Sequence, residues 1–351
     1  MNPHARVSFD KAPAIVIWEM TRACALACKH CRAEAIPHRN PLELSTTEAF
    51  ALIDDIVDCD KPMLVLTGGD PFMRDDLAKI VEYSVFRGLR TAVSPSATGR
   101  LKPESLQALS MAGCQRISLS IDAPDAASHD AFRGVVGSFE RTMRGITAAR
   151  EAGLEVQINT TISRFNHTRI AEFAELMRTL DIAFWSIFFI VPVGRAPRDQ
   201  VLSAAETEAV FADLLKASAT LPFPVKTTEA PHYRRFVAQH SPEDSPSLSE
   251  VGVSDGKGFV FVSHTGEIFP SGFLPHLVGN VRTDRLIDVY RNDPFMKRLR
   301  DPDLFEGKCG VCEFNRLCGG SRARTYAMTG SAFKSEPTCA YVSPRLALAG
   351  N

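Results

Sequence analysis

Three cysteines, Cys24, Cys28 and Cys31, fall within eight residues and directly follow an apolar run. The run is typical of a buried strand, so the thiols should lie in a short loop at a strand end, which can turn them onto one point. Iron–sulfur clusters are usually held by four thiolates, so a group of three leaves one iron free for a ligand from outside the protein. The alternative is structural, because the same spacing falls on one helix face where cysteines pack as small hydrophobes. The interleaved Lys29 and His30 argue against such burial.

A second group of thiols, Cys309, Cys312, Cys318 and Cys339, lies near the C-terminus. A closed set of four thiolates fits either a structural zinc ion or a second 4Fe–4S cluster. Closely spaced thiols in a chain that carries no export signal indicate metal binding rather than disulfides. We therefore expect two metal centres, of which only the first has an open coordination site.

The CxxxCxxC spacing just after a first strand resembles that of the radical S-adenosylmethionine (SAM) superfamily. The resemblance implies that Cys24, Cys28 and Cys31 hold a 4Fe–4S cluster whose open iron is chelated by the amino and carboxylate groups of SAM. It also implies that one electron from the reduced cluster cleaves SAM, and that the resulting 5′-deoxyadenosyl radical takes a hydrogen atom from the substrate. The protein would supply binding, orientation and exclusion of side reactions.

Motifs at the ends of later strands are similar to those with which the family holds SAM. Gly68, Gly69 and Asp70 end the second predicted strand, where glycines let the backbone approach a ligand closely. They match the family's Gly-Gly-Glu-Pro motif, with Asp in place of Glu, which implies backbone contact with the SAM amino group. Ser120 and Asp122 end the fourth strand on one face, and the matching motif implies hydrogen bonds to the ribose diol. Two further residues expected to line the nucleoside pocket, at the ends of strands five and six, are Asn159 and Val191.

The sequence around the second cysteine group resembles the C-terminal SPASM extension of radical SAM enzymes, which normally carries two auxiliary clusters. Two cysteines of that pattern are replaced here, by Ser271 and Arg322. Both would belong to the first auxiliary cluster, whereas all four retained cysteines match the second. The resemblance therefore implies a reduced SPASM-type domain with one auxiliary 4Fe–4S cluster, and a structural zinc remains the alternative.

Apolar stretches alternate with amphipathic ones from residue 13 to about 195, and this alternation predicts parallel strands with crossover helices. Six such units suggest a partial (β/α)6 TIM-like barrel that does not close, which is also the fold of the family, although the periodicity describes a doubly wound sheet equally well. The predicted strands are 14–19, 63–67, 90–94, 116–121, 155–161 and 183–192, and the predicted helices are 46–57, 75–86, 104–112, 139–152 and 168–180.

The pattern changes after about residue 200, which predicts a division into segments. A helix is expected at 204–218 and a hairpin at 259–270, and the Ser/Pro-rich stretch 241–250 is typical of an exposed linker. The division that we predict is an N-terminal tail at 1–12, the barrel at 13–220, a connecting segment at 221–255 and a cysteine-rich SPASM/twitch-like domain at 256–351.

Composition limits the class of protein. Of 351 residues, 45% are hydrophobic and 23% charged, as in an ordinary globular protein, and the formal net charge of −1 favours neither nucleic acid nor an anionic membrane. The longest apolar run is too short to span a bilayer, and the N-terminus lacks a signal sequence. An oxygen-sensitive cluster points to the reducing cytoplasm. Two isolated thiols, Cys59 and Cys114, are expected to be buried in the barrel.

Three hypotheses for the function follow. The first is a radical SAM enzyme that matures a ribosomally made peptide or a cofactor precursor, with a reductant such as ferredoxin or flavodoxin and a separate peptide-recognition partner. The second is oxidative decarboxylation of porphyrin propionates, since the segment 227–235 resembles a subgroup that includes haem-pathway decarboxylases and mycofactocin-type maturases. Here Arg234, Arg235 and Arg322 can pair with propionates. The third is a non-catalytic cluster carrier or zinc-stabilised binding module.

Catalytic residues are the least determined part of the site. Tyr233, His232 and Tyr326 are candidates for donating or relaying a proton or hydrogen atom in the cavity. The competing interpretation is that these side chains only pack and form hydrogen bonds in the core.

Overall fold

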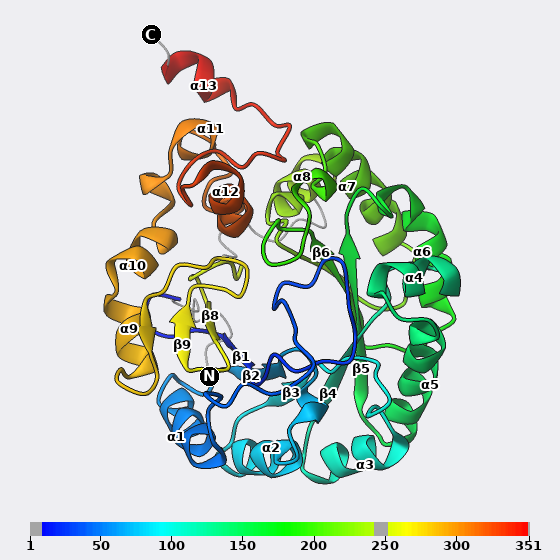
Figure 1. Cartoon of the computed structure of the whole chain (residues 1–351). Coiled ribbons are helices and arrows are strands. Elements are labelled where there is room, and N and C mark those ends of the chain that lie inside the picture. The colour runs from blue at the N-terminus through cyan, green and yellow to red at the C-terminus, as the bar shows by residue number, and fades with distance from the viewer. Residues whose placement is uncertain (1–8, 242–251, 350–351) are drawn as a thin grey trace, which may run out of the picture.

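The computed structural model describes residues 9–241 and 252–349, and its centre is one continuous sheet. The sheet curves into an open ring whose helices cover the outside, and the segment after the first strand runs through the middle of the ring (Figure 1). The strand order is β10-β9-β8-β1-β2-β3-β4-β5-β6-β7. The strands are β1 Ile15–Glu19, β2 Met63–Thr67, β3 Thr91–Val93, β4 Arg116–Ser120, β5 Glu155–Ile162, β6 Phe184–Phe189, β7 Val225–Thr228, β8 Phe259–Val262, β9 Glu267–Phe269 and β10 Gly279–Asn280.

All six predicted strands are present and pair in parallel with their neighbours in sequence order, which confirms the partial barrel. Two further strands extend the parallel set. β7 pairs with β6, and β8 pairs with β1 with Ile15 opposite Phe259. The predicted hairpin is the antiparallel pair β8–β9. The parallel sheet therefore has eight strands, and its ends come from the segments predicted to connect and follow the barrel.

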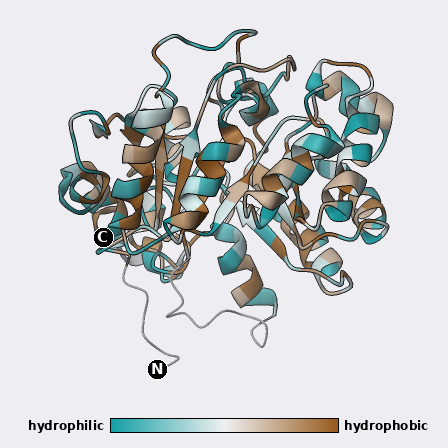
Figure 2. Cartoon of the chain, turned by 90° about the horizontal axis from the view of Figure 1, so that it is seen from below, coloured by the Kyte–Doolittle hydropathy of each residue, from teal (hydrophilic) through white to brown (hydrophobic). Residues whose placement is uncertain are grey.

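The helices form because apolar positions recur on one face and polar groups cap their ends. α1 has the predicted bounds and begins with a capping box, in which the Ser45 side chain accepts from the Glu48 amide and the Glu48 side chain accepts from the Ser45 amide. The strands carry the apolar residues, and the helices turn apolar faces toward them (Figure 2). The barrel helices are α1 Thr46–Val57, α2 Leu77–Phe86, α3 Pro103–Met111, α4 Ala126–Arg133, α5 Ser138–Glu151, α6 Ile170–Arg178 and α7 Ala204–Ser218.

The C-terminal part fills the open side of the ring, beside β6 and β8 (Figure 1). A small apolar cluster joins it to the barrel, with Val191 from the end of β6 against Leu274, Leu299, Phe305 and Ala323. No helix in the described ranges has both the length and the apolar character needed to cross a bilayer. The remaining helices are α8 His232–His240, α9 Leu286–Asn292, α10 Pro294–Arg300, α11 Gly307–Gly310, α12 Arg322–Thr329 and α13 Pro344–Ala349.

Several local expectations have clear outcomes. Cys59 and Cys114 are buried in the main core, as predicted. The helix α4 was not predicted; Asp125 caps it by accepting from the Ser128 amide, and it is only eight residues long. The predicted linker at 241–250 lies, apart from its first residue, outside the described residues.

Candidate active site

The cysteine loop lies at the C-terminal edge of the sheet and is held there by glycines. A Cβ on Gly69, after β2, would lie 2.5 Å from the carbonyl oxygen of Ala23. A Cβ on Gly194, after β6, would lie 2.4 Å from the carbonyl oxygen of Arg32, and Gly134, after α4, meets the loop in the same way. Real side chains cannot approach a backbone oxygen so closely, so these positions must stay bare. Residues after three separate elements, β2, α4 and β6, therefore pack closely against the loop that carries the first group of thiols.

The close fit at Gly69 gives a testable expectation. Gly69→Ala should push the loop away from β2 and lower SAM-cleavage activity by about 10- to 100-fold, because a small displacement of positioned groups is costly. Gly99→Ala is the matched control, since a Cβ there meets nothing within 4 Å. The measurement is the rate of 5′-deoxyadenosine formation after reduction. Equal rates for the two variants would contradict the role of this contact.

Two of the thiols accept hydrogen bonds from the backbone of their own loop. The Leu26 amide donates to Cys24 Sγ at 3.3 Å, and the Ala35 amide donates to Cys31 Sγ at 3.4 Å. The Cys24 thiol also lies 3.5 Å from Ser96 Oγ. Burial raises the pKa of Cys24, so an uncompensated thiolate would be unfavourable there. Amide donors aimed at sulfur together with an apolar surround suit thiolates bound to a metal cluster, so the loop fits the 4Fe–4S group.

The third thiol, Cys28, belongs to a buried charged group. Arg133 Nη1 lies 3.8 Å from Cys28 Sγ, and Arg133 Nη2 lies 2.5 Å from Asp122 Oδ2. His30 Nε2 is 3.9 Å from the same carboxylate oxygen. Burial alone would raise the pKa of Asp122, but the charge of Arg133 holds it below its ordinary value. Burial also lowers the pKa of His30 to about 4, so its ring is neutral near pH 7. One cation therefore faces both a thiol and a carboxylate.

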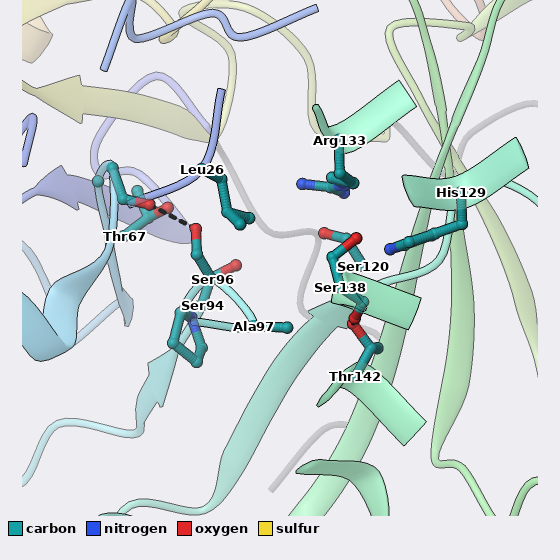
Figure 3. A pocket seen from close by; sticks show the side chains of 13 residues that line it. Leu26, Thr67, Ser94, Ser96, Ala97, Ser120, His129, Arg133, Ser138 and Thr142 are labelled. Carbon is teal, nitrogen blue, oxygen red and sulfur yellow. Dashed lines mark hydrogen bonds between the residues drawn. The ribbon is translucent and has the colours of Figure 1, made fainter. Parts of the chain in front are cut away.

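Beside this loop, a pocket of about 150 Å³ opens between β2, β3 and β4. Figure 3 shows Thr67, Ser94 and Ser96 on one side of the space and Ser120, with Arg133, on the other. Ser96 Oγ donates to the Gly69 carbonyl at 2.7 Å, which ties the two loops of the first side together. The lining residues are Leu26, Thr67, Gly68, Gly69, Ser94, Pro95, Ser96, Ala97, Ser120, His129, Arg133, Ser138 and Thr142.

The structure brings some of the predicted SAM contacts to this pocket and places others elsewhere. Gly68, Gly69 and Ser120 line it. Asp70 does not, because its carboxylate accepts from Thr98 Oγ1 at 2.7 Å and holds the loop after β3. Asp122 is fully buried; its Oδ1 accepts from the Thr161 amide and its Oδ2 faces Arg133. Asn159 is paired with Ser120 on the sheet and accepts from Gln157, and Val191 packs in the apolar cluster described above.

Residues that sequence reasoning did not assign include Ser96, His129, Arg133, Ser138 and Thr142. The segment that contains His129 and Arg133 resembles the sequence that follows the fourth strand in the family. That resemblance could have pointed to these two residues as part of the site. Among the lining residues given above, Arg133 is the one side chain with a permanent charge.

The proposed catalytic side chains lie on the C-terminal side of the barrel. His232 is fully buried, its Nε2 is 3.4 Å from Thr338 Oγ1, and burial lowers its pKa to about 3. Tyr233 packs its ring 5.2 Å from that of Phe211. Tyr326 lies against the smaller apolar cluster. None of the three lines the pocket beside the cysteine loop.

The four C-terminal thiols lie close enough to influence one another. Burial raises the pKa of Cys318, and the charges of Cys309, Cys312 and Cys339 raise it further. The Gly320 amide donates to Cys318 Sγ at 3.3 Å. The Glu336 amide and Arg322 Nη2 lie 3.3 and 3.8 Å from Cys309 Sγ. In the part of the chain that the structure describes, no three Cys, His, Asp or Glu side chains converge tightly enough for one metal ion.

The three arginines expected to meet propionates are occupied by other partners. Arg322 is 1% exposed and donates to the carbonyls of Ala332 and Lys334, both at 2.9 Å. Arg235 is paired with Glu208. Arg234 donates to the carbonyls of Leu317 and Val253. Each guanidinium group therefore already has oxygen partners: Arg235 joins α8 to α7, Arg234 reaches the tail at Leu317, and Arg322 bonds within the tail. Their pairing with propionates stays a prediction.

A buried polar network joins the end of β7 to the cysteine-rich region. Arg324 Nε donates to Glu336 Oε1 at 3.0 Å, and both side chains are 1% exposed. Arg324 also donates to the backbone carbonyl of Glu229, whose carboxylate accepts from Ser321 Oγ. Burial raises the pKa of the Glu229 carboxyl, and the charge of Asp255 raises it further. The arrangement fixes the cysteine-rich region against the mouth of the barrel.

Comparison with known proteins agrees with this geometry. The radical SAM superfamily profile matches residues 18–180. The AdoMet-dependent heme synthase of Nitratidesulfovibrio vulgaris is 43% identical over 95% of this chain and 93% of its own length. The mycofactocin maturase MftC of Mycobacterium ulcerans is 28% identical over 96% and 90% of the two chains. The structure of Streptococcus suis SuiB bound to precursor peptide SuiA superposes with a TM-score of 0.76 at 15% identity, covering 94% of this chain and 76% of that one, which shows a shared fold.

Proposed function

The chain belongs to the radical SAM superfamily, and from that premise we propose that it is an enzyme that removes the carboxyl group of a propionate side chain from an iron porphyrin. The observation that carries the proposal is the 43% identity with a heme synthase across nearly the whole of both chains. The likeness covers the cysteine-rich tail as well as the barrel, so it extends beyond the part of the fold that holds SAM.

Cys24, Cys28 and Cys31 would hold the SAM-binding 4Fe–4S cluster. When bound, the cluster and SAM would supply a 5′-deoxyadenosyl radical that takes one hydrogen atom from the propionate. Loss of carbon dioxide then leaves the vinyl group and releases one further electron, which has to pass to a one-electron acceptor. The chain itself binds and orients these groups. The glycine contacts hold the thiol loop in position. Cys24 and Cys28 are buried, so water has little access to their thiols.

The pocket residues would position SAM by complementary hydrogen bonds. The bare backbone at Gly68 and Gly69 allows close approach of an amino group, and Asp70 keeps the facing loop in place through Thr98. Arg133 and Ser120 would donate hydrogen bonds to the carboxylate of SAM, because guanidinium groups and hydroxyls are good donors to carboxylates. Asp122 would act by orienting Arg133 rather than by touching the ribose.

For the tail we propose that Cys309, Cys312, Cys318 and Cys339 hold one auxiliary 4Fe–4S cluster. Three features support this. The charges of the other three thiols add to the raised pKa of Cys318, and backbone amides donate to the sulfurs of Cys318 and Cys309. Burial raises the pKa of Cys339, and the charge of Arg235 offsets part of that rise. Cations near four thiolates offset their negative charge. Iron, sulfide and zinc analysis separates the cluster from a zinc ion.

Maturation of a ribosomally made peptide is the second candidate. It is favoured by the 28% identity with a mycofactocin maturase over 96% of this chain. The same SAM pocket would serve either substrate, so the two candidates differ in what occupies the space beyond it.

The deciding experiment supplies anaerobically reconstituted, dithionite-reduced protein with SAM and iron coproporphyrin. We expect 5′-deoxyadenosine, carbon dioxide and a porphyrin in which a vinyl group has replaced a propionate, identified by mass. Cys28→Ala protein is the control for turnover that does not need the cluster.

Formation of 5′-deoxyadenosine with an unchanged porphyrin would exclude this substrate and leave the peptide candidate. Absence of 5′-deoxyadenosine from protein shown to contain iron and sulfide would favour a non-catalytic cluster protein instead.

A further inference from the structure

One phenylalanine of β6 faces the inside of the ring of strands and is open to solvent. Ser120, which lines the pocket beside the cysteine loop, is paired on the sheet with Asn159, and Asn159 is paired with Ser186. Paired residues share a face of the sheet, so Phe188, two positions after Ser186, points to the same inner side. Phe188 is partly exposed, whereas its outward neighbour Ile187 is 0% exposed. The interior of the ring therefore reaches the Phe188 side chain.

A second aromatic ring, that of Phe273, lies against Phe188. The two ring centroids are 6.4 Å apart, and the ring planes are inclined by 48°. Phe273 is partly exposed and belongs to the turn after β9, where its amide donates to Ser271 Oγ at 3.2 Å. The two phenylalanines therefore meet where the barrel and the cysteine-rich region both border the interior.

Arg32 holds this turn beside the cysteine loop. It directly follows Cys31, and its Nη1 donates to the Gly272 carbonyl at 3.3 Å. Its guanidinium carbon lies 5.9 Å from the centre of the Phe273 ring. Its Nη2 lies 2.7 Å from Glu19 Oε2, so its charge is balanced within the protein. The phenylalanine pair is therefore fixed next to the loop that carries the first group of thiols.

The residues on either side of Phe188 are polar. Phe188 is paired with Thr161 of β5 and with Thr228 of β7, and both threonines are partly exposed. Aromatic side chains bind flat conjugated rings through their faces and edges. Threonine hydroxyls can donate hydrogen bonds to carboxylates. This part of the inner face therefore suits a ligand with a flat apolar centre and carboxylates at its edge.

We propose that Phe188 and Phe273 are specificity-determining residues, which hold the planar macrocycle of an iron porphyrin against the inner face of β6. The inference rests on the proposed porphyrin decarboxylation and names residues that would select its substrate. The contact selects for planarity, because a puckered macrocycle cannot lie flat on an aromatic side chain.

The test is a titration of the anaerobically reconstituted protein with iron coproporphyrin, followed by the Soret band. Phe188→Leu and Phe273→Leu remove a ring but keep an apolar side chain, and each should raise the Kd by about 3- to 10-fold. Phe188→Tyr keeps the ring and should bind almost as tightly as the wild type. Metal-free coproporphyrin should compete for the site. Coproporphyrinogen, which has the same carboxylates on a puckered ring, should compete much more weakly.

Phe50→Leu is the matched control, because Phe50 is also partly exposed but stacks on Tyr83 at the outside of the barrel, with the ring centroids 4.2 Å apart. This variant should keep the wild-type Kd. Iron content and SAM affinity, measured for every variant, report on the fold. Wild-type affinity in both leucine variants would overturn the inference, and so would equal competition by coproporphyrinogen. Failure of the proposed substrate would be seen already in the wild type, as an absence of porphyrin binding, whereas failure of this inference alone would be seen only in the variants and competitors.

Discussion

Cys28→Ala protein should form no detectable 5′-deoxyadenosine and should lose about half of its iron. Two 4Fe–4S clusters hold about eight iron atoms, and a cluster left with two thiolates is not retained. The substitution also removes the thiol that faces Arg133, so the buried cation keeps only Asp122 as its partner. The measurements are iron and sulfide content, and nucleoside formation after dithionite reduction.

Two other thiols provide the controls for this result. Cys59→Ala should keep all of the iron, because Cys59 is buried in the core away from both thiol groups. Cys318→Ala should also lose about half of the iron but still cleave SAM, since Cys318 belongs to the C-terminal set. If Cys28→Ala retained full iron and activity, the assignment of the first cluster would be wrong.

Arg324→Ala should lower the free energy of unfolding by about 3–5 kcal/mol, because it leaves the buried carboxylate of Glu336 without its counter-ion. It also removes donors from the carbonyls of Glu229 and Ile190, at the mouth of the barrel. Denaturant unfolding followed by tryptophan fluorescence measures the effect, since the only tryptophans of the chain, Trp18 and Trp185, are both fully buried in the barrel core.

The same pair predicts how stability depends on pH. Burial would raise the pKa of Glu336, but the charge of Arg324 lowers it to about 2. A carboxyl with a lowered folded-state pKa stabilises the protein above its ordinary value of 4.5, and this stability is lost as the pH falls toward 2. Arg324→Ala should weaken that acid dependence. Arg316→Ala, at an exposed pair with Asp303, should change stability by less than about 1 kcal/mol. Similar losses for both variants would contradict the role of burial.

Local patterns in the sequence predicted local structure well. The α1 helix has the expected bounds because its capping box involves residues only three positions apart. The strand before the cysteines was predictable for the same reason, because it depends on a few consecutive residues. The glycines after β2 were predictable in the same way. The spacing of the three cysteines predicted a loop that binds a cluster, and the glycine contacts hold that loop in place.

Side-chain direction at the site depended on distant residues and was not predictable. Asp70 turns to Thr98 because the loop after β3 supplies a hydroxyl there. Asp122 turns to Arg133, which lies eleven positions later on α4. Arg322 fills the space beside Cys309 and satisfies carbonyls of the following loop. In each case the choice among hydrogen-bond partners is made by the tertiary structure.

The parallel pairing of β1 with β8 has a consequence for how this chain is made. During synthesis β1 emerges early, yet its partner at 259–262 is translated more than two hundred residues later. Until then one edge of β1 offers unpaired amides and carbonyls to any neighbouring chain, which is a hazard for aggregation. A chain that stops before residue 259 should therefore aggregate more readily than the full chain, because that edge of β1 is left unpaired.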